Sequence, residues 1–129
     1  MTHSETSTEN ILVRVESRYV PERSEPEHSQ FFFTYSVRIS NQSDATVQLI
    51  SRHWIITDGN GQVHEVRGAG VVGEQPVLAP GEHFDYTSIC PLETEFGTMQ
   101  GSYQMVRNDG HRFDVEIAPF SLCVPNLVH

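Results

Sequence analysis

The sequence predicts an all-β domain, an antiparallel β-sandwich of about seven or eight strands. Two observations support this fold class. Apolar and polar residues alternate with a period of two along most of the 129 residues, as in strands with one buried side. Turn-forming Asn, Asp, Gly and Pro residues recur roughly every dozen residues, and no segment shows a sustained helical period.

The expected strands follow one another with their apolar residues on one face. These residues are Ile11, Val13 and Val15; Phe31, Phe33, Tyr35, Val37 and Ile39; Phe84 and Tyr86; Phe113, Val115 and Ile117; and Phe120, Leu122 and Val124. Pro119 separates the last two groups and should break or bulge the strand there, since proline cannot donate a ladder hydrogen bond.

The segment from Thr46 to Thr57 is less regular. Its apolar residues change parity between Leu49 and Trp54, and a β-bulge near Ser51 would reconcile them, because one extra residue exchanges the two faces. Trp54 is expected to be the central core aromatic. Arg52 shares its face, so it is expected either to stack on Trp54 or to reach the glycine-rich loop described below.

Turn signals connect these strands. They are Pro21–Ser29, Asn41–Asp44, Asp58–Gly61 and Asn108–Gly110. Residues 1–129 are expected to form a single domain, which at this length can fold around one core. The first ten residues are polar, and we expect them to be flexible.

Charge and composition exclude several classes of protein. The formal net charge is −9, and the eight basic residues are all arginine, so nucleic acid and anionic membranes are disfavoured partners. No signal-peptide pattern and no apolar run of about 20 residues occurs, which predicts a cytoplasmic protein without membrane insertion. Cys90 and Cys123 are expected to be free thiols in that compartment, although a disulfide stays possible.

A glycine-rich loop from Gly68 to Glu82 contains the pattern GxGxxG. In dinucleotide-binding proteins that pattern opens a helix whose N–H groups hold a pyrophosphate. Here Pro76 and Pro80 follow closely and no helical period appears, so we expect the chain to stay extended and predict no nucleotide cofactor. Two roles remain open for the glycines: a tight path over the sandwich edge, or a backbone nest for an anion.

Candidate binding residues gather in this loop. They are Arg52, Gly68, Gly70, Val71, Val72, Gly73, Glu74 and Gln75. Val71 and Val72 are unusual between glycines, and each is expected either to be tucked under the loop or to form an exposed contact patch.

Metal and catalytic sites find little support. The seven histidines show no HxH or HExxH spacing, and the two cysteines form no CxxC pair. His53 and His64 would be diagonal neighbours on one face in one register of the hairpin, yet no third ligand is evident. The sequence also contains no nucleophile elbow and no convincing carboxylate pair, so we predict neither a metal site nor an enzyme.

An ordered series of motifs resembles the ApaG family along nearly the whole chain. The motifs are Arg52-x-Trp54, Asp58–Gly61, Gly70–Pro76 with Pro80–Glu82, Tyr86–Ser88, Gly97–Gly101 with Tyr103 and Met105, and Phe120-x-Leu122. Ile89 departs from that family, which usually has glycine there, so the local backbone path is in question. The resemblance implies an immunoglobulin-like sandwich of the fibronectin type III kind.

The resemblance also implies associations. Members are linked to cobalt and magnesium tolerance or efflux, their gene often lies beside that of a diadenosine tetraphosphate hydrolase, and related domains occur in F-box proteins and a polymerase-delta-interacting protein. A sandwich used in such different proteins suits a binding module. Because no membrane span is evident, an effect on cations is expected to be indirect.

Two functional hypotheses follow. The first is a non-catalytic adaptor that docks another protein through the glycine-rich loop, the adjoining strand face or a free strand edge. The second is a sensor of a small anion or metal–nucleotide, such as pyrophosphate, ATP or diadenosine tetraphosphate, with Arg52 as counter-charge. A nucleotide hydrolase is disfavoured, because no general base or metal site for it is evident.

Overall fold

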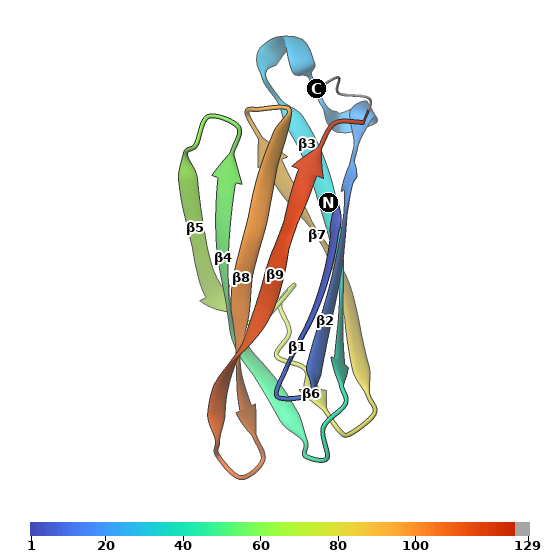
Figure 1. Ribbon diagram of the computed structural model, residues 1–129, viewed down its shortest axis with the longest axis vertical. Helices are drawn as coiled ribbons and strands as arrows, with labels where there is room; N and C mark the ends of the chain where they lie inside the picture. The colour runs from blue at the N-terminus through green and yellow to red at the C-terminus, as the bar shows by residue number, and fades with distance from the viewer. Residues whose placement is uncertain (126–129) are drawn as a thin grey trace.

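The computed structural model describes residues 1–125 and confirms the all-β prediction (Figure 1). The described residues form nine strands in two antiparallel sheets. The first sheet has the order β1 (His3–Thr8), β2 (Ile11–Tyr19), β3 (Phe31–Asn41) and β7 (His83–Leu92). The second has the order β5 (Val63–Ala69), β4 (Val47–Asp58), β8 (Phe96–Arg107) and β9 (Arg112–Cys123), and the short β6 (Val77–Leu78) also pairs with β4.

The strand order is that of a fibronectin type III sandwich. Without β1 and β6, one sheet reads β2-β3-β7 and the other β5-β4-β8-β9. The polar connection between β2 and β3 contains two single 3₁₀ turns, η1 (Pro21–Arg23) and η2 (Pro26–His28). No helix among the described residues has the length and apolarity needed to cross a membrane.

The core lies where the alternating pattern predicts it. The five apolar residues on one face of β3 (Phe31, Phe33, Tyr35, Val37 and Ile39) are buried, and Trp54 is 2% exposed. Tyr35 meets the Trp54 ring edge-on, with ring centroids 5.1 Å apart, and Phe120 lies 6.0 Å from Trp54 on another side. The Tyr35–Trp54 contact joins the two sheets, whereas Trp54 and Phe120 belong to the same sheet, and both contacts have the edge-to-face geometry that aromatic rings prefer.

Both expected irregularities are present. The pairing of β4 with β8 shifts register between Leu49 and Ser51, so Leu49 and Trp54 both face the core despite their different parity. In β9 the partner of Met99 is Phe120 and the partner of Gly101 is Ile117, which leaves one extra residue in the stretch that contains Pro119. Each bulge therefore corrects the face of the residues that follow it.

The N-terminal segment differs from the expectation of flexibility. Residues His3–Thr8 form β1, which pairs with β2 over six positions, and Ser4 Oγ also donates a hydrogen bond to Ala118 of β9 (2.8 Å). The segment has no alternating apolar pattern, and none of its side chains is buried. Its order comes from backbone hydrogen bonds, which hydropathy patterning does not report.

The two sides of the sandwich differ as a result. On one side β1 lies beside β9, and Ser17 Oγ of β2 donates to the carbonyl of Ser121 (2.6 Å), which closes the gap between the sheets. On the other side the outermost strands are β5 and β7, and they belong to different sheets. That open side holds the glycine-rich loop and the candidate residues.

Candidate functional site

The glycine-rich loop is a tight hairpin that follows β5. Val71 and Glu74 exchange backbone hydrogen bonds of 2.8 and 2.9 Å, which leaves Val72 and Gly73 at the tip. Both tip residues have positive φ, +43° for Val72 and +80° for Gly73, as in a type I′ turn. We call residues 70–75 the glycine hairpin.

The two adjacent valines have opposite environments. Val71 is 1% exposed and belongs to the core, whereas Val72 is 54% exposed. The two alternatives left open by the sequence are therefore both realised, one by each residue. Val71 fixes the hairpin against the sandwich, and Val72 presents an apolar side chain to solvent.

Arg52 reaches the glycine hairpin, which decides between its two expected positions. Its Nη1 atom donates hydrogen bonds to the carbonyl oxygens of Ala69 (3.0 Å) and Gly70 (2.8 Å). Gly68 lies beneath the guanidinium, since a Cβ there would come within 2.8 Å of Nη2. Arg52 thus anchors the base of the hairpin through charge-assisted hydrogen bonds.

Gly70 is required by geometry. Its φ is +63°, and a Cβ on it would approach the carbonyl oxygen of Glu74 to 2.2 Å. Gly73 differs, because a Cβ there meets nothing within 4 Å. The glycines therefore support a close backbone path, which is the first of the two roles left open by the sequence.

The N–H groups of the hairpin are largely used within the protein. Gly70 donates to the carbonyl of Ile50 (2.8 Å), while Val71 and Glu74 donate to each other. The side chain of Gln75 donates to the same Ile50 carbonyl (2.9 Å). An anion at this hairpin would find few donors, because a nest needs successive N–H groups that converge on the ligand.

The chain after the hairpin stays extended, as expected. Its residues 77–78 form β6, and a turn at Gly81 (φ +87°) leads into β7. No helix follows the glycines within the described residues, so the GxGxxG pattern here lacks the helix N-terminus on which a dinucleotide site depends.

The histidine pair expected from one hairpin register is not formed. His53 is opposite Arg67 and His64 is opposite Ile56, which puts the two histidines on different faces of the second sheet. His53 Nε2 instead lies 2.8 Å from a carboxylate oxygen of Glu65. Within residues 1–125, no three His, Cys, Asp or Glu side chains converge as a metal site would require.

A groove lies between β5 and β7 on the open side, with a volume of about 760 Å³. Its apolar lining includes Ile56 and Val66 from the second sheet and Phe32, Ile89 and Pro91 from the first. Val66 is 41% and Ile89 is 52% exposed, which is high for such residues. We call this the open-side groove.

Ile89 belongs to a regular strand. It pairs with Thr34 and has no positive φ, so the departure from the family's usual glycine leaves the backbone path undisturbed. Its neighbour Cys90 is 4% exposed and also lines the groove. Burial raises the pKa of the Cys90 thiol to about 11. Cys90 and Cys123 are both free thiols.

Sequence reasoning missed two polar features of the sandwich. One is buried: the hydroxyl groups of Tyr86 and Tyr103 form a hydrogen bond that links the two sheets, and burial raises the pKa of both. The sequence does not show this contact, because β7 and β8 belong to different sheets and the contact depends on how the sheets pack.

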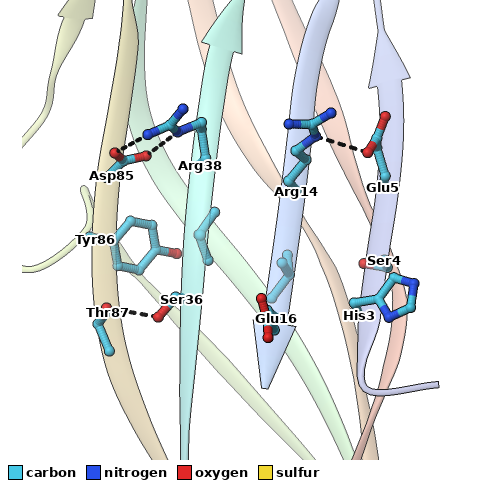
Figure 2. Close-up of a pocket in the computed structure, with 12 residues that line it drawn as sticks. His3, Ser4, Glu5, Arg14, Glu16, Ser36, Arg38, Asp85, Tyr86 and Thr87 are labelled. Atoms are coloured by element: carbon cyan, nitrogen blue, oxygen red, sulfur yellow. Dashed lines mark hydrogen bonds and ion pairs between the residues drawn. The ribbon is translucent and has the colours of Figure 1, made fainter. Parts of the chain in front are cut away.

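The second feature is a shallow depression on the outer face of the first sheet (Figure 2). Arg14 and Arg38 are opposite each other on β2 and β3. Arg14 pairs with Glu5 (2.8 Å), and Arg38 makes two hydrogen bonds to Asp85, which hold the pKa of that carboxyl below its usual value. Each arginine is thus balanced by a carboxylate, and the row is a solvated face.

Comparisons with known proteins agree with this geometry. The sequence profile described as the ApaG domain matches residues 21–107. "Protein ApaG" of Anaeromyxobacter dehalogenans is 60% identical over 118 residues, which is 92% of this chain and 93% of that protein. "Protein ApaG" of Azotobacter vinelandii is 56% identical over 119 residues, 92% of this chain and 94% of the other.

Solved structures share the fold. The crystal structure named for an ApaA protein from Bordetella pertussis superposes with a TM-score of 0.87 at 53% identity and covers 97% of both chains. A C-terminal domain of wzt superposes with a TM-score of 0.55 at 9% identity, covers 98% of this chain and 80% of that one, and shows the fold alone. By profile, sequence identity and structure, the chain belongs to the ApaG family.

Proposed function

We propose that this protein is a non-catalytic binding module that docks another protein through the glycine hairpin. The observation that carries the proposal is Val72, a β-branched residue with φ of +43° and an exposed side chain at the tip of the hairpin. A valine in the left-handed region is a genuine outlier, and such a residue costs about 1–3 kcal/mol.

Folding alone does not account for Val72. Two-residue turns with positive φ at both positions favour Asn-Gly, because asparagine tolerates that conformation. Here the same turn carries Val72-Gly73, which keeps the strain and adds exposed apolar surface. Strain that persists at an exposed position is a reason to infer a contact.

The hairpin also has the rigidity that a docking element needs. Val71 is buried beneath it, Arg52 bonds its base and Gln75 bonds Ile50. A preorganised tip loses little conformational entropy when a partner binds. The geometry favours this use over anion binding, because Arg52 and most hairpin N–H groups already have partners.

The partner we propose is a cytoplasmic protein. The association with cobalt and magnesium tolerance that the ApaG family carries would then act through that partner, without direct binding of the cation by this chain. The acidic net charge of −9 favours a partner with a basic surface.

Affinity capture from a cell lysate tests the proposal. The Val72→Gly variant removes the exposed side chain and relieves the positive φ, so we expect it to raise the free energy of unfolding by about 1 kcal/mol and to lose the captured partner. The control is Val77→Thr, which changes an equally exposed valine on β6 (58% exposed) and should keep the partner. Equal recovery with wild type and Val72→Gly would refute the docking role.

A further inference from the structure

The free edge of β5 has fewer of the features that protect sheet edges than β9 and β7 have. Natural edges are shortened, bulged, covered, or guarded by proline or charged side chains. Here β9 is covered by β1, and β7 carries Pro91. In contrast, β5 pairs with β4 in unbroken register from Val63 to Ala69, contains no proline, and is protected only by the charged side chains of Glu65 and Arg67.

The backbone groups on that edge are available. Gln62 accepts a hydrogen bond from Asp58 of β4, and Gly70 donates one to Ile50 of β4. The direction of the backbone hydrogen bonds alternates along an antiparallel strand. The N–H and C=O groups of the even-numbered residues of β5 therefore point to β4, and those of the odd-numbered residues point away from it. Val63, Glu65 and Arg67 therefore present N–H and C=O groups to solvent, and all three are exposed.

We propose that β5 accepts an extended segment of a partner protein as an added strand, with every second side chain of that segment entering the open-side groove. The inference rests on the proposed function above and names how the partner binds. Side chains of an added strand alternate between the two faces of the sheet, so one set would lie over Val66 and reach Ile89 across the groove. The groove is lined by Ile56, Val66 and Ile89 and also by polar side chains such as Gln62 and His64, so we expect the inward residues that lie over its apolar part to be apolar.

Charge at one end of the groove adds a second requirement. The β2–β3 connection, the β4–β5 turn and the β7–β8 turn gather at one end of the sandwich (Figure 1). Their exposed acidic residues are Glu22, Glu25, Glu27, Glu93 and Glu95. The basic groups there are Arg23, which stacks on Phe32, and His28. The complementary segment thus carries arginine or lysine at the end that lies over these turns.

A defined peptide tests strand addition. The probe alternates isoleucine with threonine and carries two arginines at one end. We expect NMR titration to shift the amide signals of Val63, Glu65 and Arg67, and to protect those amides from hydrogen exchange. Two control peptides are matched: one carries glutamates in place of the arginines, and one is N-methylated at alternate residues so that it cannot donate to β5. Both should bind about tenfold more weakly or worse.

A protein variant provides the second arm. Arg67→Pro removes an outward N–H and keeps the bonds of the even-numbered residues to β4, whereas Arg67→Ala keeps the N–H and removes the same side chain. We expect only the proline variant to lose the probe, by about tenfold. Thermal unfolding identifies a variant that fails to fold, and in that case Val63→Pro with Val63→Ala replaces the pair.

The outcomes separate the two proposals. No probe binding at millimolar concentration, or shifts confined to residues outside β5, would overturn strand addition. The capture experiment with Val72→Gly tests the docking role independently, since Val72 lies outside β5. Loss of the captured partner with Val72→Gly, together with full capture by Arg67→Pro, supports the docking role and contradicts strand addition.

Discussion

The closed side and the open side of the sandwich differ in what lies between the edges of the two sheets. On the closed side, polar β1 bridges β2 and β9 through backbone bonds and serine or threonine hydroxyls, and no side chain of β1 is buried. On the open side, the open-side groove lies between β5 and β7, and Arg52 anchors a strained hairpin that follows β5. A polar strand like β1 would also be enough to cover the open side. The exposed apolar residues and the strained hairpin there are therefore consistent with the binding role proposed above.

The largest expected effect is at Gly70. In Gly70→Ala the Cβ would clash with the Glu74 carbonyl at 2.2 Å in a backbone with φ of +63°. We expect the free energy of unfolding to fall by about 3 kcal/mol, measured by urea denaturation. The matched control is Gly73→Ala, where φ is +80° but space is free, and about 1 kcal/mol should be lost. Equal losses would show that the hairpin is not packed as described.

Arg52→Met comes next, since it keeps the length of the side chain and removes both hydrogen bonds to Ala69 and Gly70. The expected loss is about 2 kcal/mol, because these bonds are charge-assisted and one is partly buried. Hydrogen exchange should accelerate at Gly70 and Val71 more than in β2. Uniform acceleration over both sheets would contradict a local anchoring role.

A smaller loss is expected on the closed side. Ser17→Ala removes the hydroxyl that bonds the Ser121 carbonyl at 2.6 Å and the Thr2 carbonyl at 3.2 Å. About 1 kcal/mol should be lost in chemical denaturation, and exchange should increase in β1 without a change in the glycine hairpin. An equal response at the hairpin would mean that the two sides are coupled, and the comparison above would fail.

The sequence predicts the closed and open sides unequally. The alternation in β3 and the parity change before Trp54 were sufficient for the core and one bulge, because burial imposes a period of two. The polar β1 could not be foreseen, since backbone pairing leaves no hydropathy signal. The sequence does not decide between the two positions of Arg52, because the direction of a long side chain depends on the neighbouring strand.

The candidate site was predictable only in part. The glycine pattern indicated a close backbone path, and the prolines after it indicated that no helix follows. The opposite environments of Val71 and Val72 depend on a single turn, which the sequence does not favour, because Asn-Gly is the preferred pair. The open-side groove joins residues of β3, β4, β5 and β7, and such tertiary contacts have no short-range pattern.

The effect that is smallest at neutral pH concerns Cys90, which lines the open-side groove. Its pKa is raised to about 11 by burial, so the folded protein keeps the proton at a pH where the unfolded chain has released it. Stability is therefore independent of this thiol below about pH 8 and falls as the pH rises from about 8.5 to 11, because the folded state then binds more protons than the unfolded state. Cys90→Ala should reduce the fall in the free energy of unfolding with pH. The fall that remains reflects the buried tyrosines, whose pKa values are also raised.

Thiol labelling at pH 8 gives the matching kinetic measurement. The native Cys90 should react more slowly than Cys123, because it is 4% exposed and protonated. Equal labelling rates would show that the Cys90 thiol is accessible to solvent through the groove. The probe peptide should slow the labelling of Cys90 further, since a strand added along β5 would cover the groove from outside. Unchanged labelling with bound peptide would place that peptide elsewhere on the protein.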